Sequence, residues 1–277
     1  MRLTKKQIHQ QIEGTKTIRE LMNAYEEIAA LRMKRIRQQV VKSRDFHKIL
    51  THYFHEIRYL PKVKGQPVLQ SPETFLAILL SDDKGLYGEI LAKTKDSFVQ
   101  FAKANPDYQL AVIGTQAQES IKEELPDRNA RFFSLHTTPL TQDLKDIAAL
   151  LTQFSHIVVF HGEFVNLINQ IPAITYLTGE EDVPEAPQTT NQYLLEPSHE
   201  SLLTFFQKEI VSVLLDQAIL EGTLSKEASR MVSLEKASEE ARNKIKRLKR
   251  LSRVINAQRQ NKEQITYLAG LSLWNIH

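Results

Sequence analysis

The chain has 277 residues, enough for one or two domains, and its share of apolar residues (42%) and charged residues (25%) is that of an ordinary soluble protein. It contains no cysteine, which excludes disulfides, thiolate metal sites and thiol switches, and no apolar run approaches the roughly 18 residues of a membrane helix. Because the first six residues lead into a polar helical pattern without the apolar stretch of a secretory signal, we expect a cytosolic or cytosol-facing protein.

The net charge of +3 hides an uneven distribution along the chain. Residues 1–60 carry 13 basic and 6 acidic side chains, residues 61–195 carry 10 and 17, and residues 196–277 carry 13 and 10. Two basic ends around an acidic middle predict three segments with boundaries near 60 and 195. Basic segments attract nucleic acid, anionic lipid or an acidic protein surface.

Residues 1–60 predict one long helix, because no proline occurs before Pro61 and Gly14 is the only glycine. The second half carries a coiled-coil seam that steps alternately by four and three residues: Ile36, Val40, Ser43, His47, Leu50, Phe54 and Ile57. The first half is less regular, and its candidates are Ile8, Ile12, Thr15, Leu21, Met22, Tyr25, Ile28 and Ala29. Such a helix needs a partner that covers its stripe.

Residues 61–195 alternate between strand and helix patterns. The predicted strands are Phe75–Leu80, Leu110–Ile113, Arg131–His136 and His156–Phe160. The predicted helices between them are Tyr87–Ala104, Thr115–Glu124 and Thr141–Phe154. Ile174–Leu177 and Tyr193–Leu195 are candidates for further strands, around an acidic loop at Thr178–Asn191. This alternation is typical of a small α/β domain with a mostly parallel sheet.

From Glu196 onward the pattern is helical again, and Gly222 is the only expected interruption before Gly270. Small and large residues alternate along its seam: Leu224, Ala228, Met231, Leu234, Ser238, Ala241, Ile245, Leu248, Ser252 and Ile255. Because small residues let a second helix approach closely, we predict antiparallel pairing with the N-terminal helix. The predicted fold is α/β, with an antiparallel coiled coil of long N- and C-terminal helices (1–60 and 196–277) bracketing a Rossmann-like α/β domain (61–195).

Short motifs lie along this frame. They are Ser81 to Gly88 after the first strand, Glu196-Pro197-Ser198, Glu227 to Leu234, and Asn256 with Arg259 and Gln260. In this order they resemble four motifs of the gamma subunit of F-type ATP synthases: Ser-Asp-(Lys/Arg)-Gly-Leu-Cys-Gly-Gly, Glu-Pro-Ser, Glu-x-Ala-x-Arg-Met-x-Ala-Met and Asn-x-x-Arg-Gln. The N-terminal Leu21, Ala24, Ile28, Ala29 and Ala30 are also similar to the family's pattern. The resemblance covers essentially the whole chain, and the Arg-Met and Asn-x-x-Arg-Gln segments are its most specific part.

The chain also departs from the family's motifs. Tyr87 stands in the place of the usual cysteine, and Glu89 stands in the place of the second glycine. Ile265-Thr266 follows the Arg-Gln pair after four residues, where the family has two. We interpret the chain as a divergent gamma-type subunit and hypothesise that it comes from a second, non-housekeeping rotary ATPase.

The resemblance implies a rotor shaft that is not itself a catalyst and needs no cofactor of its own. It implies the ATPase alpha and beta subunits, the epsilon subunit and the membrane c-ring as partners. Association with the cytoplasmic face of a bacterial inner membrane would then be indirect, through the complex. The residues that match the family's motifs as structural elements are Asp83, Gly85, Gly88, Glu196, Pro197, Arg230 and Met231.

Gly85 to Gly88 follows a predicted strand and precedes a predicted helix, where a phosphate loop often lies. The sequence there is neither Gly-x-x-x-x-Gly-Lys-Ser/Thr nor Gly-x-Gly-x-x-Gly. A tight turn that lets the helix pack on the sheet is the favoured interpretation, and a phosphate site is the alternative. The resemblance implies that nucleotide sites lie on partner subunits.

Residues 242–253 contain seven basic side chains in twelve positions, including Lys246, Arg247, Lys249 and Arg250. The alternatives are a solvated helix face and an electrostatic contact with acidic loops of surrounding catalytic subunits, to which Arg32, Lys34, Arg35 and Arg37 would add. We do not expect nucleic-acid binding, because aromatic residues for base stacking are lacking nearby. Asn256, Arg259 and Gln260 are further candidates for contact with a catalytic subunit, as the resemblance implies; a plain surface position is the alternative.

The nine histidines follow no zinc-ligand spacing, and His52 and His55 share a predicted helix face without a third ligand. The spacing of serine, histidine and aspartate assembles no catalytic triad. Two other functional classes remain open from the residues alone. One is a coiled-coil adaptor with an α/β head, and the other is a small nucleotide-binding enzyme.

Overall fold

The computed structural model describes residues 4–58, 73–134, 147–178 and 199–274, apart from positions 84, 86, 148, 149 and 152. The chain divides into two compact units, each described by itself below. The terminal unit comprises Met1–Ala29 with Met231–His277, and the head unit comprises Ala30–Arg230. The predicted boundaries at 60 and 195 lie outside the described residues and stay a prediction.

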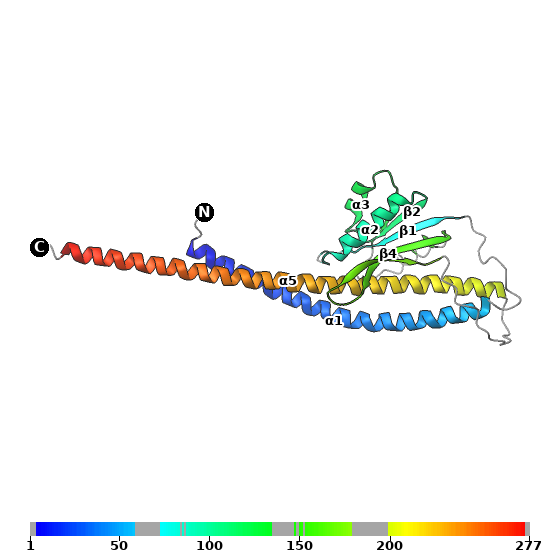
Figure 1. Cartoon of the computed structure of the whole chain (residues 1–277), viewed down its shortest axis with the longest axis horizontal. Coiled ribbons are helices and arrows are strands. Elements are labelled where there is room, and N and C mark those ends of the chain that lie inside the picture. Colours follow the sequence, from blue (N-terminus) through cyan, green and yellow to red (C-terminus); the bar gives the residue numbers. More distant parts are fainter. Residues whose placement is uncertain are drawn as a thin grey trace. The chain divides into compact units, whose positions relative to one another are not determined.

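Two long helices run through the fold, α1 (Lys5–Arg58) and α5 (His199–Trp274) (Figure 1). At the start of α1, Thr4 and Gln7 form a reciprocal capping box. The backbone amide of Gln7 donates to Thr4 Oγ1 at 3.3 Å, and the backbone amide of Thr4 donates to Gln7 Oε1 at 2.9 Å. The two helices pair in the terminal unit through Ile8, Ile12, Ile245 and Leu248. Ser238 donates to the side chain of Asn23 at 2.9 Å. The order of these contacts along the two helices is antiparallel, as predicted.

The inward face of α1 follows one alternation of fours and threes in each unit. In the terminal unit this face consists of positions 8, 12, 15, 19, 22, 26 and 29, and in the head unit of 33, 36, 40, 43, 47 and 50, all buried or half-buried. Positions 16, 30 and 51 beside this face are half-buried as well. The predicted seam of the second half is confirmed over its described positions. In the first half, the prediction that Leu21, Tyr25 and Ile28 belong to the inward stripe is wrong, because these residues are 56%, 39% and 44% exposed. Arg19 and Glu26 take the inward positions, since the heptad phase continues through them.

The head unit holds a five-stranded sheet of order β3-β2-β1-β4-β5. Its strands are β1 (Phe75–Leu80), β2 (Tyr108–Ile113), β3 (Ala130–Phe133), β4 (His156–Phe164) and β5 (Gln170–Tyr176). Neighbouring strands pair in parallel except β4 and β5, which are antiparallel. The mostly parallel α/β domain is therefore confirmed, although β4 continues beyond its predicted end and β5 begins before its predicted start. Most of the predicted helix at 141–154 and the strand at 193–195 lie outside the described residues.

Helices α2 (Ile90–Ala104) and α3 (Gln118–Glu124) cover one face of this sheet (Figure 1). There the ring of Phe98 meets that of Phe160 edge-on, with 5.4 Å between centroids. The other face packs against α5: Leu76, Ile78 and Val159 share a buried cluster with Ile210, Leu214 and Ala218. Successive strand residues point to opposite faces, so a sheet that is covered on both sides needs the nearly continuous apolar runs seen in β1 and β4.

Across the parts of the chain that the structure describes, no helix combines the length and the apolar character needed to cross a membrane.

Candidate functional site

The loop that follows β1 is tied to the loop that follows β2. The amide of Thr115 donates to Asp83 Oδ1 at 2.8 Å, and the amide of Gln116 donates to the Asp82 carbonyl at 2.9 Å. Gly114 has a φ of +108°, and a Cβ there would lie 2.5 Å from the Asp82 amide nitrogen. Only glycine fits at this position, because a side chain would meet both steric strain and a fixed backbone.

The two predicted motif glycines lie in the loop after β1. Gly88 adopts a φ of 65°, the left-handed conformation that a tight turn into α2 requires. A Cβ on Gly85 would lie 3.3 Å from the side-chain nitrogen of Gln116. The loop is therefore a compact turn whose backbone is held by its neighbour, and Asp83 is the side chain that fixes the two loops together.

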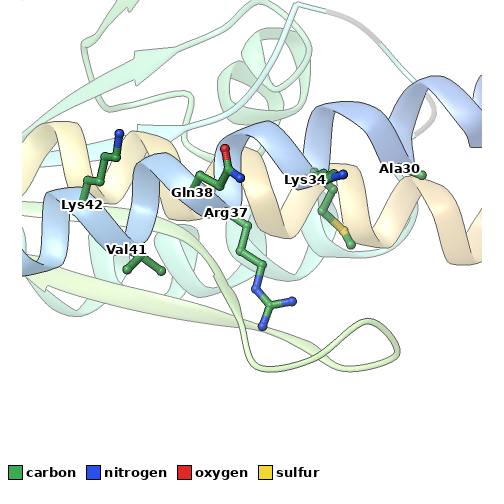
Figure 2. Close-up of a pocket in the computed structure, with 7 residues that line it drawn as sticks. Ala30, Lys34, Arg37, Gln38, Val41 and Lys42 are labelled. Atoms are coloured by element: carbon green, nitrogen blue, oxygen red, sulfur yellow. The ribbon is translucent and has the colours of Figure 1, made fainter.

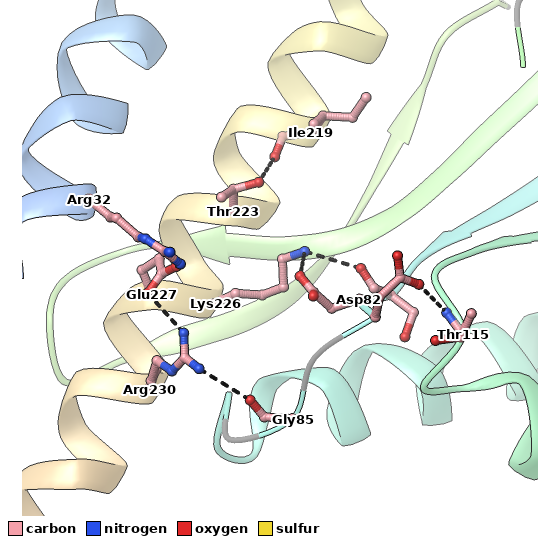
Figure 3. Close-up of polar contacts among 11 residues, drawn as sticks. Arg32, Asp82, Gly85, Thr115, Ile219, Thr223, Lys226, Glu227 and Arg230 are labelled. Atoms are coloured by element: carbon pink, nitrogen blue, oxygen red, sulfur yellow. Dashed lines mark hydrogen bonds and ion pairs between the residues drawn. The ribbon is translucent and has the colours of Figure 1, made fainter. Parts of the chain in front are cut away.

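Helix α5 reaches this loop with a lysine. Lys226 is 7% exposed, and its ammonium donates to the Ser81 carbonyl at 3.1 Å and to Asp82 Oδ2 at 2.7 Å (Figure 3). A buried ammonium needs such partners, because removing the charge from water is costly. Sequence reasoning missed Lys226, since nothing local distinguishes it from the exposed lysines farther along the same helix.

One turn later, Arg230 contacts the other end of the loop. Its guanidinium lies over the ring of Tyr87, 4.6 Å from the centroid. It also donates to the Gly85 carbonyl at 3.5 Å (Figure 3). The ammonium of Lys226 lies 5.7 Å from the same centroid. Burial raises the pKa of Tyr87 to about 12, with the charges of Asp82 and Glu227 adding to the effect. The phenol is thus neutral, and its ring face accepts both cations.

Two buried glutamates of α5 are paired with arginines of α1 within the head unit. Arg32 Nη1 lies 3.2 Å from Glu227 Oε1, and Arg44 Nη2 lies 2.7 Å from Glu221 Oε1. The glutamate side chains are 3% and 10% exposed. Arg32 stays 43% exposed in this pair, and Lys34, Arg35 and Arg37 are exposed as well, so their joint contribution to a basic surface stays a prediction.

Side chains of α5 occupy the carboxyl ends of β1 and β4, the point where strand order reverses and where open α/β sheets bind ligands. Lys226 bonds the carbonyl that follows β1, and Ser225 Oγ lies 3.4 Å from the Glu163 carbonyl in β4. A Cβ on Gly162 would lie 2.6 Å from Ser225 Oγ. Because protein side chains fill this crevice, the structure favours the tight-turn interpretation of Gly85 to Gly88 over a phosphate loop.

The predicted subunit-contact residues lie on α5 in the terminal unit. Lys246, Arg247, Lys249 and Arg250 are exposed, on either side of the seam residues Ile245 and Leu248. Asn256 is half-buried, and Arg259 and Gln260 are exposed. Arg259 Nε donates to Glu263 Oε1 at 2.7 Å, one turn farther along the helix. We call Lys246, Arg247, Lys249 and Arg250 the basic belt.

One side of α1 carries an open hollow lined by Ala30, Met33, Lys34, Arg37, Gln38, Val41 and Lys42 (Figure 2). All of these residues come from one helix, so the hollow is a surface depression and does not enclose a small molecule. Its mixed basic and apolar lining suits a protein surface better than a compact ligand.

The remaining predictions concern metals and motifs. Within the described ranges, no group of three or more histidine, aspartate and glutamate side chains could hold a metal ion. His161, which sequence reasoning did not single out, is buried and its Nε2 lies 2.8 Å from Thr175 Oγ1; burial lowers its pKa. Met231 is half-buried on α5, and Glu196 and Pro197 lie outside the described residues.

A family model described as ATP synthase matches residues 4–267 of the chain. The ATP synthase gamma chain of Brevibacillus brevis is 25% identical over 260 residues, which cover 88% of this chain and 89% of that relative. The gamma chain of Fusobacterium nucleatum is 22% identical over 274 residues, which cover 96% and 97%.

Solved structures show the same fold. A chain of the Euglena gracilis mitochondrial ATP synthase rotor superposes with a TM-score of 0.61 at 17% identity, covering 94% of this chain and 98% of that one. A chain of the Tetrahymena thermophila mitochondrial ATP synthase central stalk and c-ring superposes with a TM-score of 0.56 at 19% identity, covering 79% and 99%.

Proposed function

We propose a role for this chain from the premise that it belongs to the ATP synthase family, as a gamma-type, non-catalytic rotor subunit. In this role its paired α1 and α5 helices form the shaft of an F-type enzyme. The shaft couples ion-driven rotation of a membrane ring to ATP synthesis or hydrolysis in a surrounding ring of alpha and beta subunits. Shape and stiffness are what this role requires of the chain, and acid–base chemistry is left to the partners.

The observation that carries the proposal is the antiparallel pairing of α1 and α5. Ile8 and Ile12 bury their side chains against Ile245 and Leu248, and the basic belt on the same stretch of α5 stays exposed. When two helices bury their apolar seams against each other, neither needs a further partner to cover its seam. The outer surface of the pair is then available for contacts with other subunits. An exposed basic surface is suited to acidic loops of a surrounding protein ring.

Residues 257–269 of α5 are all exposed, including Ile265, Tyr267 and Leu268 at 66%, 77% and 67%. Exposed apolar side chains on a single helix are typical of a segment that is covered in a complex. We assign this segment, which includes Arg259 and Gln260, together with Asn256 to contact with the alpha and beta subunits. The planar guanidinium of Arg259, with its rigidly arranged N–H donors, suits a fixed carboxylate or carbonyl partner.

The head unit is assigned to the membrane side of the rotor, with an epsilon subunit and the c-ring as its partners. The chain would then lie at the cytoplasmic face of a bacterial membrane and be attached to it only through the complex. Asp83, Gly85, Gly88 and Arg230 serve the structure of the head unit in this assignment, since their contacts are internal.

Co-purification from the chain's own host tests the proposal. A tagged chain is expected to bring down ATPase alpha and beta subunits, and the untagged chain serves as the control for non-specific capture. Recovery of the chain without any ATPase subunit would contradict the rotor and favour a free-standing coiled-coil adaptor. Nucleotide binding to the purified chain separates the third class: a dissociation constant for ATP in the micromolar range would contradict a shaft without a nucleotide site.

A further inference from the structure

We propose that Lys226 and Arg230 act as a torque-bearing clamp that locks the loop after β1 to α5, so that the sheet and the shaft helix turn as one body. This inference rests on the proposed rotor function and concerns how the head unit transmits rotation to its own part of α5. Lys226 and Arg230 are positioning residues in this role.

The sheet and the loop after β1 hold α5 through two zones that differ in chemistry. One zone is apolar and involves α5 residues between Ile210 and Ala218, which pack on the sheet face. The other is polar and involves Lys226 and Arg230, which contact the loop after β1. Lys226 lies eight positions after Ala218, which is about 12 Å along the helix axis. Between them Ser225 Oγ donates to the Glu163 carbonyl of β4 at 3.4 Å, so contact with the sheet continues along this length. This longer contact resists tilting and twisting of the helix better than the apolar zone alone.

The two zones differ in what they resist. The hydrophobic effect is non-directional, and its strength follows the apolar area that is removed from water. Hydrogen bonds and close ion pairs depend steeply on distance and angle. Lys226 holds a carbonyl and a carboxylate at once, and Arg230 holds a carbonyl and a ring face. The polar zone therefore fixes the register between α5 and the loop.

Burial makes this zone unsuited to a role in binding an outside partner. Lys226, Glu227 and Arg230 are 7%, 3% and 8% exposed. A buried network of charges adds little net stability over an apolar core of the same shape, and its best attested benefit is to specify one geometry. Asp83 in turn ties the start of this loop to the loop after β2, because its Oδ1 accepts a hydrogen bond from the Thr115 amide at 2.8 Å.

Two side chains of the loop that contact the clamp residues stand where this chain departs from the gamma-subunit motif. The motif has one aspartate before the basic residue, whereas this chain has Asp82 and Asp83. Asp82 accepts a hydrogen bond from the ammonium of Lys226, and Asp83 accepts one from the backbone amide of Thr115. Tyr87, in the place of the usual cysteine, supplies the ring under Arg230. The departures in the loop thus meet the two cations of α5.

The test uses the complete ATP synthase of the host, assembled with variant chains in membrane vesicles. Lys226→Met removes the charge and keeps a long unbranched side chain, and Tyr87→Leu removes the ring. Lys236→Met is the matched control, because Lys236 is an exposed lysine of the same helix. The measurements are ATP hydrolysis, the amount of assembled complex, and ions pumped per ATP hydrolysed against an increasing opposing ion gradient.

Lys226→Met and Tyr87→Leu are expected to retain ATP hydrolysis and to lose ions pumped per ATP as the opposing gradient rises. Lys236→Met is expected to pump like the wild type, and Lys226→Arg to restore pumping. If the contact had only a structural role, its loss would lower the amount of assembled complex, and this effect would be the same at every gradient. Loss under load therefore identifies a mechanical link.

An assembled Lys226→Met complex that pumps like the wild type at the steepest gradient would overturn the clamp. If that variant does not assemble, Tyr87→Leu decides by the same measurement, and failure of both to assemble would replace the clamp with a purely structural role. Failure of the rotor proposal itself is a different result, since the wild-type chain would then neither assemble with the ATPase nor support pumping.

Discussion

The guanidinium of Arg230 lies 4.6 Å from the centroid of the Tyr87 ring, with both side chains buried. The two residues are 143 positions apart in the sequence, and the contact joins the loop after β1 to α5 within the head unit. A ring face offers a buried cation an electrostatic partner without adding a second charge that needs desolvation. The contact explains why an aromatic residue occupies this turn.

Tyr87→Phe is expected to change the alkaline stability of the chain. The raised pKa of about 12 means that the folded state keeps its phenol proton where an unfolded tyrosine, with a pKa of 10.0, loses it. The unfolded state therefore binds fewer protons, and stability falls as the pH rises from about 10 to about 12. Urea unfolding across this range is expected to show that the free energy of unfolding falls less steeply with pH in Tyr87→Phe than in the wild type. The exposed Tyr53 changed to Phe is the control. An identical alkaline slope in wild type and Tyr87→Phe would contradict the prediction.

Gly114→Ala is expected to destabilise the chain by about 3 kcal/mol, because a non-glycine residue at positive φ is strained and must also push against backbone. The added Cβ would lie 2.5 Å from the Asp82 amide nitrogen. Gly14→Ala is the matched substitution: this glycine lies in α1, with nothing within 4 Å of the added Cβ. It is expected to raise stability by about 0.5–1 kcal/mol through helix propensity. Urea unfolding of both variants measures the contrast, and equal effects of the same sign would refute it.

Arg44→Met is expected to lower stability by leaving Glu221 without its arginine. The glutamate side chain is 10% exposed, and Arg44 Nη2 and Nε lie 2.7 and 2.8 Å from the same carboxylate oxygen. Breaking a fully buried pair costs about 3–5 kcal/mol, but Arg44 is 48% exposed, so solvent screening reduces the expected cost to about 1–2 kcal/mol. The exposed Arg35 changed to Met is the control, measured by the same unfolding assay. A loss no larger than that of the control would show that Glu221 does not depend on Arg44.

Glu26→Gln is expected to stabilise the terminal unit near neutral pH. Burial raises the pKa of Glu26 above 4.5, and the facing Glu235 raises it further. A raised carboxyl pKa gives the folded state a stabilising contribution that is present in acid and is lost as the pH rises through that pKa. Melting followed by circular dichroism is expected to show a higher Tm for the variant at about pH 7 and little difference at about pH 4. The exposed Glu20 changed to Gln serves as the comparison, and a gain that persists unchanged in acid would exclude the mechanism.

Reversal of Lys246, Arg247, Lys249 and Arg250 to Glu is expected to weaken assembly or coupling in the ATP synthase complex. All four side chains are exposed beside the seam, so the reversal leaves the packing of α5 in place. The defect is expected to be largest at low salt, since screening weakens contacts between exposed charges. Coupled ATPase activity at two salt concentrations measures it. Unchanged coupling at both would mean that the basic belt is only a solvated helix face.

The sequence determined the elements of this fold to a large extent, because their signals are local. Absence of proline and a four-three spacing predicted α1 and the seam of α5, and apolar runs predicted β1 and β4. The order of short motifs led to the gamma-type family that the comparisons support. The phase of the first half of α1 was the weak point, since Leu21, Tyr25 and Ile28 compete there with the true inward face.

Only the tertiary structure decided which charges are internal. Lys226 and Lys246 are the same residue type on the same helix, yet one is buried against the loop after β1 and the other is exposed. The difference arises from a contact between residues 145 positions apart, and no local pattern contains it. Burial of a charge depends on the partner that a distant part of the chain supplies. Nothing local therefore marks Glu227 and Arg230 as buried before Arg32 and Tyr87 are placed beside them.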